Sequence, residues 1–382
     1  MDQNNSTKSF LTRFLSYILV AAVASAATWA MASILPNSKL EQISSLIENR
    51  YIGEADQTVL EDTAAAAMVS ALPDRWSTYI PAAQYQAHVD NQNNEFVGIG
   101  VTIIKREGTG FEILEVTKGG PAEEAGICPG DFITAVDGQD VTGADVDNLQ
   151  SMIPGKVNTT VDLTLRRGEQ TLDVTVKRKV IHKQAVEGQL LDNQIGLITI
   201  DNFHKDAGEE TIAQVELLLE QGAQKLIFDV RNNPGGYVDE MNKALDYLLP
   251  EGPLFRSVDY KGKESVDESD KNCLELPMAV LINGNSYSAA EFFAAALSEY
   301  EWAVTVGEPT TGKGYFQNTL ELMDGSALYL SVGKYFTPNG VSLADVGGLV
   351  PDVPVEPAQG LVKAEEDPQI QAAIRALTEQ KQ

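Results

Sequence analysis

The chain has 382 residues, which is enough for two or three domains of roughly 100 to 200 residues each. Its 28 basic and 55 acidic side chains give a formal net charge of -27, and because nucleic-acid binding depends on basic surface, this balance argues against a nucleic-acid partner. A hydrophobic content of 43%, with 31 glycines and 16 prolines, is ordinary for a globular protein and argues against a disordered or collagen-like chain.

The amino end carries a candidate membrane segment. Residues 14–35 contain no charged side chain and are long enough to cross a bilayer core of about 30 Å. Lys8 and Arg13 precede the segment, and the positive-inside rule therefore places the acidic remainder of the chain outside the cytoplasm. The sequence ASA at residues 24–26 resembles a signal-peptidase site, so a cleaved signal peptide competes with an uncleaved anchor. Since the apolar run continues past that site, we favour a single-pass anchor over residues 1–36, with secretion after cleavage as the alternative.

A helical region is expected at residues 37–92. Apolar residues recur at three- and four-residue spacing over residues 38–72 with a break around Gly53, which predicts two helices. A further short helix is expected after the turn DRWSTYIP. The polar run at residues 91–95 marks the boundary to the next unit.

Short apolar runs separated by glycine-rich turns predict a small sheet module at residues 93–180, with one amphipathic helix. The run FVGIGV and the later GPA, AG and PGD motifs together resemble bacterial PDZ domains. Gly98 and Gly100 allow tight turns whose N–H groups can converge on a terminal carboxylate, and the following strand offers an edge for peptide addition. We therefore expect a protein tail to bind at Gly98, Ile99, Gly100 and Val101.

Strands and helices alternate beyond residue 181, which is typical of an α/β domain. The expected elements are strands at 195–200, 225–230 and 278–283, helices at 207–221, 237–249 and 289–300, and a hairpin at 315–336 around Asp324-Gly325. The charged segment 250–276 is predicted to be a loop-dominated insertion. The end of the chain, residues 361–382, is predicted to be a capping helix.

The cysteines and histidines limit which metal sites and catalytic triads the chain can form. Cys128 and Cys273 have no CxxC partner, so no metal cluster is visible, and a single long-range disulfide and two free thiols both remain open. A Ser-His-Asp triad would need the distant His204, and the sequence contains no HExxH zinc motif.

Ser288 is the first candidate catalytic residue. It follows the strand expected at 278–283 and begins the next helix, where N–H groups and the helix dipole favour a developing negative charge. Ser288 and Glu291 also match a capping box, which is the purely structural alternative. If Ser288 is a nucleophile, its base is a lysine rather than a histidine.

Lys313 and the run DVRNNPGG at residues 229–236 are the other candidates. Lys313 lies in GEPTTGKG, which matches the spacing of a phosphate loop, but Gly314 stands where a hydroxyl should reach magnesium and a strand-like pattern follows, so we reject an ATP site. A buried Lys313 would be favoured as the neutral amine, which can accept a proton, whereas an exposed one would be a solvated loop residue. The glycine pair of DVRNNPGG either forms an oxyanion hole or makes only a tight turn.

Taken together, these motifs resemble the C-terminal processing (tail-specific) serine peptidases with a Ser-Lys dyad. The resemblance covers about residues 38–356 and rests on DRWSTYIP, the PDZ motifs, DVRNNPGG, LINGNSYSAAE, VGEPTTGKGYFQ and YFTPNG with GLVPDVPV. It implies a crotonase-like α/β peptidase domain at residues 181–360, with an inserted PDZ domain and an amino-terminal helical segment. It also implies Ser288 as nucleophile, Lys313 as general base, Gln317 as the residue that holds the lysine, and backbone oxyanion donors at Ala289 and at Gly235 or Gly236.

The expected function is that of an extracytoplasmic serine endopeptidase that recognises the carboxyl-terminal tails of protein substrates through its PDZ domain. The resemblance implies no metal or organic cofactor. The expected partners are protein substrates and, through the amino-terminal helix, a membrane, while a homo-oligomer stays open. The alternative is a membrane-tethered PDZ scaffold without catalytic activity, against which the presence of Ser288, Lys313 and Gln317 argues.

Overall fold

The computed structural model describes residues 17, 20, 38–360 and 362–379. The expected membrane segment at residues 14–35 therefore lies outside the described residues, apart from Tyr17 and Val20. Within the described part of the chain, every helix is too short or too polar to cross a bilayer. The chain divides into two compact units, Met1–Pro81 and Ala82–Gln382.

The described part of the first unit consists of two helices and a short strand, which are α2 (Lys39–Arg50), α3 (Gln57–Ser70) and β1 (Thr78–Ile80). Helix α2 begins at a capping box, because the Ser38 hydroxyl accepts the N–H of Glu41 while the Glu41 carboxylate accepts the N–H of Ser38. The carboxylate of Asp56 caps α3 by accepting the N–H of Thr58. The two predicted helices and the break between them are confirmed.

The second unit begins with α4 (Ala82–Gln92) and continues into the sheet module expected at residues 93–180. Two short strands, β2 (Glu95–Gly98) and β9 (Lys179–His182), pair antiparallel where the chain enters and leaves the module. Between them one antiparallel sheet has the order β3-β4-β5-β7-β8, and β6 pairs with β5. The bounds are β3 (Val101–Arg106), β4 (Gly110–Val116), β5 (Phe132–Val136), β6 (Gln139–Asp140), β7 (Thr160–Arg167) and β8 (Gln170–Lys177).

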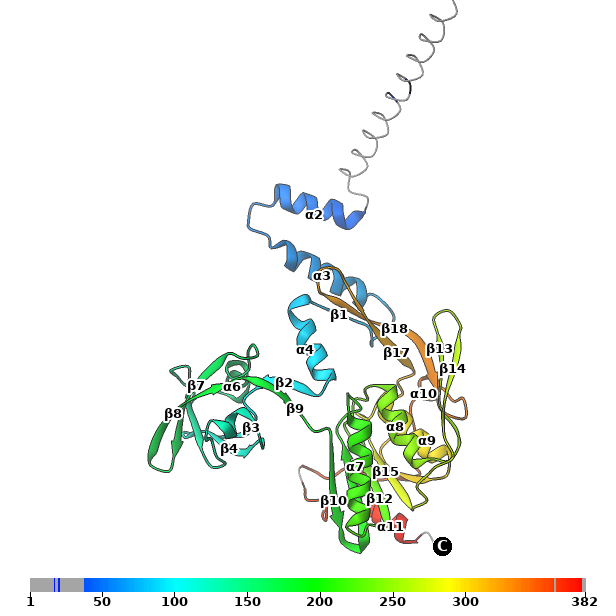
Figure 1. Ribbon diagram of the computed structural model, residues 1–382. Helices are drawn as coiled ribbons and strands as arrows, with labels where there is room; N and C mark the ends of the chain where they lie inside the picture. Colours follow the sequence, from blue (N-terminus) through cyan, green and yellow to red (C-terminus); the bar gives the residue numbers. More distant parts are fainter. Residues whose placement is uncertain (1–16, 18–19, 21–37, 361, 380–382) are drawn as a thin grey trace, which may run out of the picture. The chain divides into compact units, whose positions relative to one another are not determined.

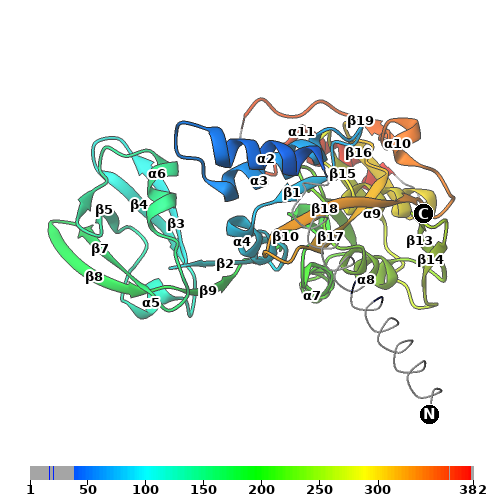
Figure 2. The ribbon, with the colours of Figure 1, turned by 90° about the horizontal axis from the view of Figure 1, so that it is seen from above.

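The module has its own hydrophobic core. Helices α5 (Pro121–Glu124) and α6 (Val146–Met152) accompany the sheet (Figure 2). Phe111, Ile113 and Leu165 from the strands and Leu149 from α6 are fully buried in the core. Apolar side chains at alternate positions of β7 supply one side of it, as the strand period requires.

The expected α/β domain is built on a six-stranded sheet of order β10-β11-β12-β15-β16-β19. Strand β10 is antiparallel to β11, and the other pairs are parallel. The bounds are β10 (Val186–Leu191), β11 (Ile195–Ile200), β12 (Lys225–Asp229), β15 (Met278–Ile282), β16 (Ala303–Gly307) and β19 (Val353–Pro354), with a short 3-10 helix at Asp192–Gln194. Strands β12 and β15 are almost wholly buried, as continuous apolar runs in a parallel sheet predict.

Helices cover both faces of this sheet (Figure 1). Side chains of α7 (Ala207–Glu220), α8 (Val238–Leu248) and α9 (Ala289–Glu299) share one core with Phe228 and Val280. On the opposite face α11 (Pro368–Glu379) packs Ile370 and Leu377 onto Ile227 and Leu281. Because successive strand residues point to opposite faces, neighbouring residues such as Ile227 and Phe228 enter different cores.

One prediction for this region was wrong. The segment 250–276, predicted to be a loop-dominated insertion, forms the antiparallel pair β13 (Gly252–Asp259) and β14 (Glu264–Ser269). Strand β14 is mostly exposed, so its charged residues face solvent and the segment lacks the apolar alternation that signals a strand.

Strand β13 joins a second sheet through β18. The hairpin predicted at residues 315–336 is confirmed as β17 (Tyr315–Glu321) and β18 (Ala327–Phe336). The last part of β18 also pairs with β13, so β18 is bound both to its hairpin partner β17 and to a strand far from it in the sequence. A short helix, α10 (Leu343–Val346), follows the hairpin.

Candidate active site

Ser288 lies in the tight turn between β15 and α9. Its backbone has a φ of 59°, a conformation that is strained for any residue except glycine, and its exposed fraction is 9%. Its N–H donates to the carboxylate of Glu291 at 3.0 Å, a contact of the expected capping box. Its hydroxyl oxygen lies 2.9 Å from the hydroxyl of Tyr335. Ser288 is therefore more than a helix cap, because a strained backbone holds its hydroxyl against a second buried hydroxyl.

Lys313 lies in the loop between β16 and β17 and is buried, with an exposed fraction of 5%. Its Nζ lies 6.0 Å from the centre of the Tyr287 ring. The structure thus agrees with the buried alternative for this lysine and not with the solvated one.

A single carboxylate joins the segments that carry Ser288 and Lys313. Besides the N–H of Ser288, the Glu291 carboxylate accepts hydrogen bonds from the N–H of Lys313 at 2.9 Å, the N–H of Gly312 at 2.6 Å and the hydroxyl of Thr310 at 2.6 Å. Glu291 is 0% exposed. This burial raises the pKa of Glu291, although the surrounding donors favour the charged form.

The glycine turn of DVRNNPGG lies directly against Ser288. Gly235 has a φ of 87°, and a Cβ at this position would lie 2.7 Å from the Ser288 Cβ and 2.8 Å from the backbone nitrogen of Ala289. The N–H of Gly235 donates to the side-chain oxygen of Asn233 at 2.7 Å. The structure therefore brings Ser288, Ala289 and the glycine turn together, with the N–H of Gly235 already bound.

Gly236 also needs to be glycine, for a different reason. Its φ is 153°, and a Cβ would lie 2.2 Å from the carbonyl of Phe203, which pairs with it in an isolated bridge. Close backbone packing thus fixes this side of the turn.

Gln317 lies on β17, four residues after Lys313. Its side-chain nitrogen donates to the hydroxyl of Ser331 on β18 at 2.9 Å and to the carbonyl of Tyr315 at 3.1 Å. The contact with Ser331 crosses the β17–β18 hairpin, and the contact with Tyr315 stays within β17.

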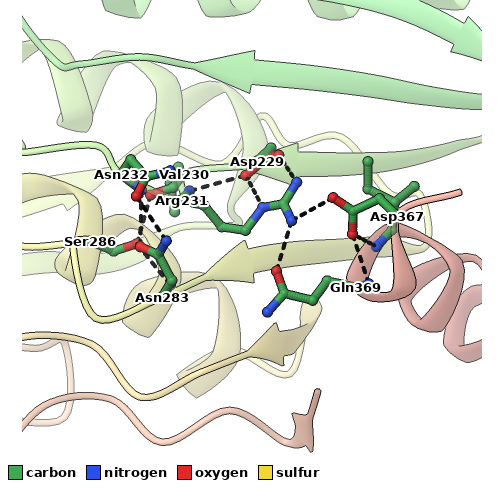
Figure 3. Close-up of polar contacts among 9 residues, drawn as sticks. Asp229, Val230, Arg231, Asn232, Asn283, Ser286, Asp367 and Gln369 are labelled. Atoms are coloured by element: carbon green, nitrogen blue, oxygen red, sulfur yellow. Dashed lines mark hydrogen bonds and ion pairs between the residues drawn. The ribbon is translucent and has the colours of Figure 1, made fainter. Parts of the chain in front are cut away.

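Arg231 connects the loop after β12 to the start of α11 (Figure 3). Its guanidinium donates to both oxygens of Asp229, to Asp367 at 2.9 Å and to Gln369 at 2.7 Å. Burial alone would raise the pKa of Asp367, but the hydrogen bonds and charge of Arg231 hold it below its usual range.

Asparagines fix the next part of the same loop (Figure 3). The N–H of Asn232 donates to the side-chain oxygen of Asn283, whose own amide donates back to Asn232, each at 3.0 Å. The hydroxyl of Ser286 donates to the carbonyl of Val230 at 2.7 Å. Side chains from both segments, Asn232 on one and Asn283 and Ser286 on the other, therefore tie the glycine turn to the Ser288 turn.

The expected tail-binding residues of the PDZ module line one cavity of about 380 Å³. Gly98, Ile99, Gly100 and Val101 form it together with Phe96, Ile103, Gln150, Ile153 and Pro154. It thus lies between β3 and α6. Gly100 has a positive φ of 76°, which glycine adopts without strain, whereas Gly98 is the last residue of β2.

Sequence reasoning missed two groups at this site. Glu291 was singled out only as part of a capping box, and Tyr335 was one letter of the motif YFTPNG. Neither could be found from spacing, because Thr310, Gly312 and Tyr335 meet Ser288 and Glu291 only in the folded chain. The two cysteines are free thiols, with Cys128 exposed and Cys273 half-buried.

Comparison with known proteins agrees with this fold. The family described as peptidase family S41 matches residues 194–355, and the PDZ domain family matches residues 112–167. A crystal structure of a putative S41 protease from Bacteroides fragilis superposes with a TM-score of 0.52 at 16% identity, covering 91% of this chain and 99% of that one. The fold is thus an S41 peptidase fold with a PDZ domain, which confirms the predicted crotonase-like α/β class.

Two curated relatives show the protein family to which the chain belongs. A probable CtpA-like serine protease of Staphylococcus aureus strain COL is 33% identical over 323 residues, which are 84% of this chain and 64% of that protein. The protein of the same description from the bovine strain RF122 is 31% identical over 375 residues, which are 93% of this chain and 75% of that protein. The chain belongs to the family of CtpA-like serine proteases, and it spans about 64% of the length of the first of these relatives.

Proposed function

We propose that this chain is a serine endopeptidase that binds the carboxyl-terminal tail of a protein substrate in its PDZ domain and cleaves the substrate with Ser288 and Lys313. The observation that carries the proposal is the buried carboxylate of Glu291. It binds the backbone N–H groups of both Ser288 and Lys313, so the candidate nucleophile and the candidate base are held by one side chain.

In the proposed mechanism Ser288 attacks the scissile carbonyl while Lys313, as the neutral amine, takes the proton from its hydroxyl. The carbonyl oxygen becomes an oxyanion, which the N–H of Ala289 at the start of α9 stabilises together with an N–H of the glycine turn. Since the N–H of Gly235 is bound to Asn233, Gly236 is the candidate for the second donor.

The tetrahedral intermediate then collapses to an acyl-enzyme, and Lys313 returns its proton to the leaving amine. A water molecule hydrolyses the ester in the same way, and Ser288 regains its proton. Gln317, which lies on β17, is proposed to limit the movement of the Lys313 side chain.

The tail of the substrate is proposed to bind in the cavity at Gly98, Ile99, Gly100 and Val101. An extended tail can add to the edge of β3. The backbone N–H groups around Gly98 and Gly100 of the PDZ domain can hold its terminal carboxylate. The apolar side chains that line the cavity, such as Phe96 and Ile103, favour an apolar last residue.

An extracytoplasmic location, with residues 14–35 as anchor or signal peptide, is part of the proposal and rests on the sequence alone. Protease added to intact cells tests it, because an extracytoplasmic catalytic part is degraded while a cytoplasmic marker survives. Survival of the catalytic part along with the marker would contradict this location.

The test of the activity is cleavage of an unstructured protein with an apolar tail by the full chain in mild detergent. Wild type, Ser288→Ala and Lys313→Ala are compared on substrates whose tail is a free carboxylate or an amide. We expect cleavage by wild type only, and slower cleavage of the amidated substrate. If wild type binds the tail but never cleaves it, the PDZ scaffold replaces the peptidase; if both tails are cleaved equally, the PDZ domain does not recognise the carboxylate.

A further inference from the structure

The hydroxyl of Tyr335 reaches Ser288 from a different sheet. Tyr335 lies on β18, has an exposed fraction of 2%, and places its hydroxyl oxygen 2.9 Å from that of Ser288, which begins α9. The two residues are 47 positions apart in the sequence. A contact between two buried hydroxyls of separate elements is a specific feature, because an unpaired one would cost free energy.

An aromatic cage fixes the ring of Tyr335. The ring centre of Phe292 lies 4.6 Å away in an edge-to-face arrangement, that of Phe255 lies 5.4 Å away, and that of Phe316 lies 6.1 Å away in a stacked arrangement. Phe292 is on α9, Phe255 on β13 and Phe316 on β17. Packing from three elements therefore leaves the hydroxyl little freedom to leave Ser288.

The backbone of Tyr335 is bound to the loop of the candidate base. Its N–H donates to the carbonyl of Gly314, the residue after Lys313, at 3.2 Å. Tyr335 thus contacts the Ser288 side chain with its hydroxyl and the Lys313 loop with its main chain. A residue so placed is well suited to act on the proton transfer between the two.

Tyr335 keeps its proton at neutral pH. Burial raises the pKa of Tyr335 well above its usual range, and the nearby negative charge of Glu291 acts in the same direction. Its hydroxyl is therefore a hydrogen-bond donor, and Ser288, which has two lone pairs, can accept that hydrogen while its own O–H points elsewhere.

We propose that Tyr335 is a further catalytic residue of the Ser288 site, whose hydroxyl donates a hydrogen bond to the Ser288 oxygen throughout the reaction. This inference rests on the proposed function. In the ground state the bond directs the Ser288 proton towards Lys313. As that proton moves to the lysine, the oxygen gains negative charge, and the bond from Tyr335 becomes charge-assisted and stronger.

The same bond acts when the acyl-enzyme breaks down. Water gives one proton to Lys313 as its oxygen adds to the ester carbon, the bond between that carbon and the Ser288 oxygen then breaks, and the electron pair stays on the Ser288 oxygen. The Tyr335 hydroxyl stabilises this charge until Lys313 returns the proton. Tyr335 gives up no proton of its own in either half of the reaction.

The test is the rate at which a fluorophosphonate, a serine-reactive probe that needs no tail recognition, labels the full chain. For Tyr335→Phe, which keeps the ring in its cage, we expect labelling to be about 10 to 100 times slower, the range for losing one donor to a developing charge. The final extent of labelling is expected to equal that of wild type, because the site stays folded but reacts more slowly.

Tyr300→Phe is the matched control. Its hydroxyl donates to the carbonyl of Pro253 at 3.1 Å, next to the carboxyl end of α9, so its removal is expected to leave the labelling rate unchanged. Replacement of Tyr335 by 3-fluorotyrosine keeps both ring and hydroxyl, and it is expected to label within about threefold of wild type. If Tyr335→Phe does not fold, this second variant still tests the proposal, since a labelling loss above about threefold with the hydroxyl retained would overturn it.

The other outcomes separate failure of the Tyr335 inference from failure of the proposed function. Labelling of Tyr335→Phe at the wild-type rate would show that the hydroxyl has no part in the chemistry, and faster labelling would show that it restrains Ser288 instead; either result overturns the inference and leaves the peptidase intact. If wild type itself is not labelled at Ser288, the proposed function fails first, and the inference falls with it.

Discussion

The carboxylate of Glu291 accepts a hydrogen bond from the backbone N–H of Lys313 at 2.9 Å, across 22 positions of the sequence. The same carboxylate binds the N–H of Ser288, so the relative position of the two candidate catalytic segments depends on one buried side chain. Thr310 and Gly312 complete its set of donors. The contact gives Glu291 a role that a helix cap alone would not have.

Glu291→Gln is expected to lower both cleavage and stability. The amide can accept at one oxygen only, and its NH₂ group faces backbone N–H donors, so at least one buried donor is left unpaired at a cost of about 1 to 3 kcal/mol. We expect kcat/KM to fall at least about tenfold. Steady-state cleavage and thermal unfolding of the same preparations check this.

Glu299→Gln is the control for that substitution. Glu299 binds the hydroxyl of Thr337 and the N–H of Asn339 at the other end of α9, so it has similar partners away from Ser288. Stability is expected to fall and kcat/KM to stay within about twofold, because the Ser288 and Lys313 segments keep their contacts. Equal losses of activity in both variants would mean that Glu291 acts only through overall stability.

Gly235→Ala is expected to slow cleavage by about a hundredfold. A Cβ would lie 2.7 Å from the Cβ of Ser288, so the glycine turn or the Ser288 turn must move, and a displacement of about 1 Å can cost roughly a hundredfold in rate. Gly262→Ala in the β13–β14 turn is the control, since its φ of 79° is similar but its Cβ meets nothing within 4 Å. Both variants carry backbone strain of about 1 to 2 kcal/mol, and only Gly235→Ala should lose activity. Normal kcat/KM for Gly235→Ala would disprove the close packing.

Arg231→Lys is expected to loosen α11 from the loop after β12. A lysine cannot contact Asp229, Asp367 and Gln369 at once, and a buried carboxylate left without its partner costs about 3 to 5 kcal/mol at most. Chemical unfolding should show a clear loss, and amide hydrogen exchange should rise in α11. Lys183→Gln breaks the exposed pair with Asp201 and is expected to change stability by less than about 1 kcal/mol. Unchanged exchange in α11 would refute the role of Arg231.

Asp131 is expected to make the PDZ domain less stable in acid. Burial opposes its ionisation, but hydrogen bonds from Arg167 and from the N–H of Cys128 lower the pKa of Asp131 below its ordinary value of 3.8. Because the folded pKa is the lower one, the stabilisation is fully present above about pH 4 and is lost as pH falls through the folded value.

Asp131→Asn should therefore destabilise the PDZ domain by about 2 kcal/mol at pH 7, with a smaller difference from wild type below about pH 3. Denaturant unfolding followed by hydrogen exchange within residues 112–167 measures this. Glu112→Gln, which breaks the more exposed pair with Arg106 in the same domain, is expected to cost less than about 1 kcal/mol. A difference between Asp131→Asn and wild type that stays constant from pH 7 to below about pH 3 would contradict the assignment.

Much of the peptidase domain follows from the sequence. The runs that form β12 and β15 are continuous and apolar, and α9 follows a turn whose residues cannot continue a strand, so their order and type are local properties. The segment that became β13 and β14 lacked such a signal. Its outer strand faces solvent, and pairing of β13 with β18 joins the β13–β14 pair to a larger sheet.

The sequence by itself determined that Ser288 begins a helix, that Lys313 lies between glycines and that the glycine pair of DVRNNPGG makes a turn. Those facts depend on neighbouring residues and are written in local order. Only the tertiary structure decided that Glu291 binds the N–H groups of both candidate catalytic segments, that Gly235 abuts Ser288, and that Tyr335 reaches the Ser288 hydroxyl. These contacts join residues of different strands, helices and loops, and the packing of sheets and helices around a shared core, rather than any spacing along the chain, sets their distances.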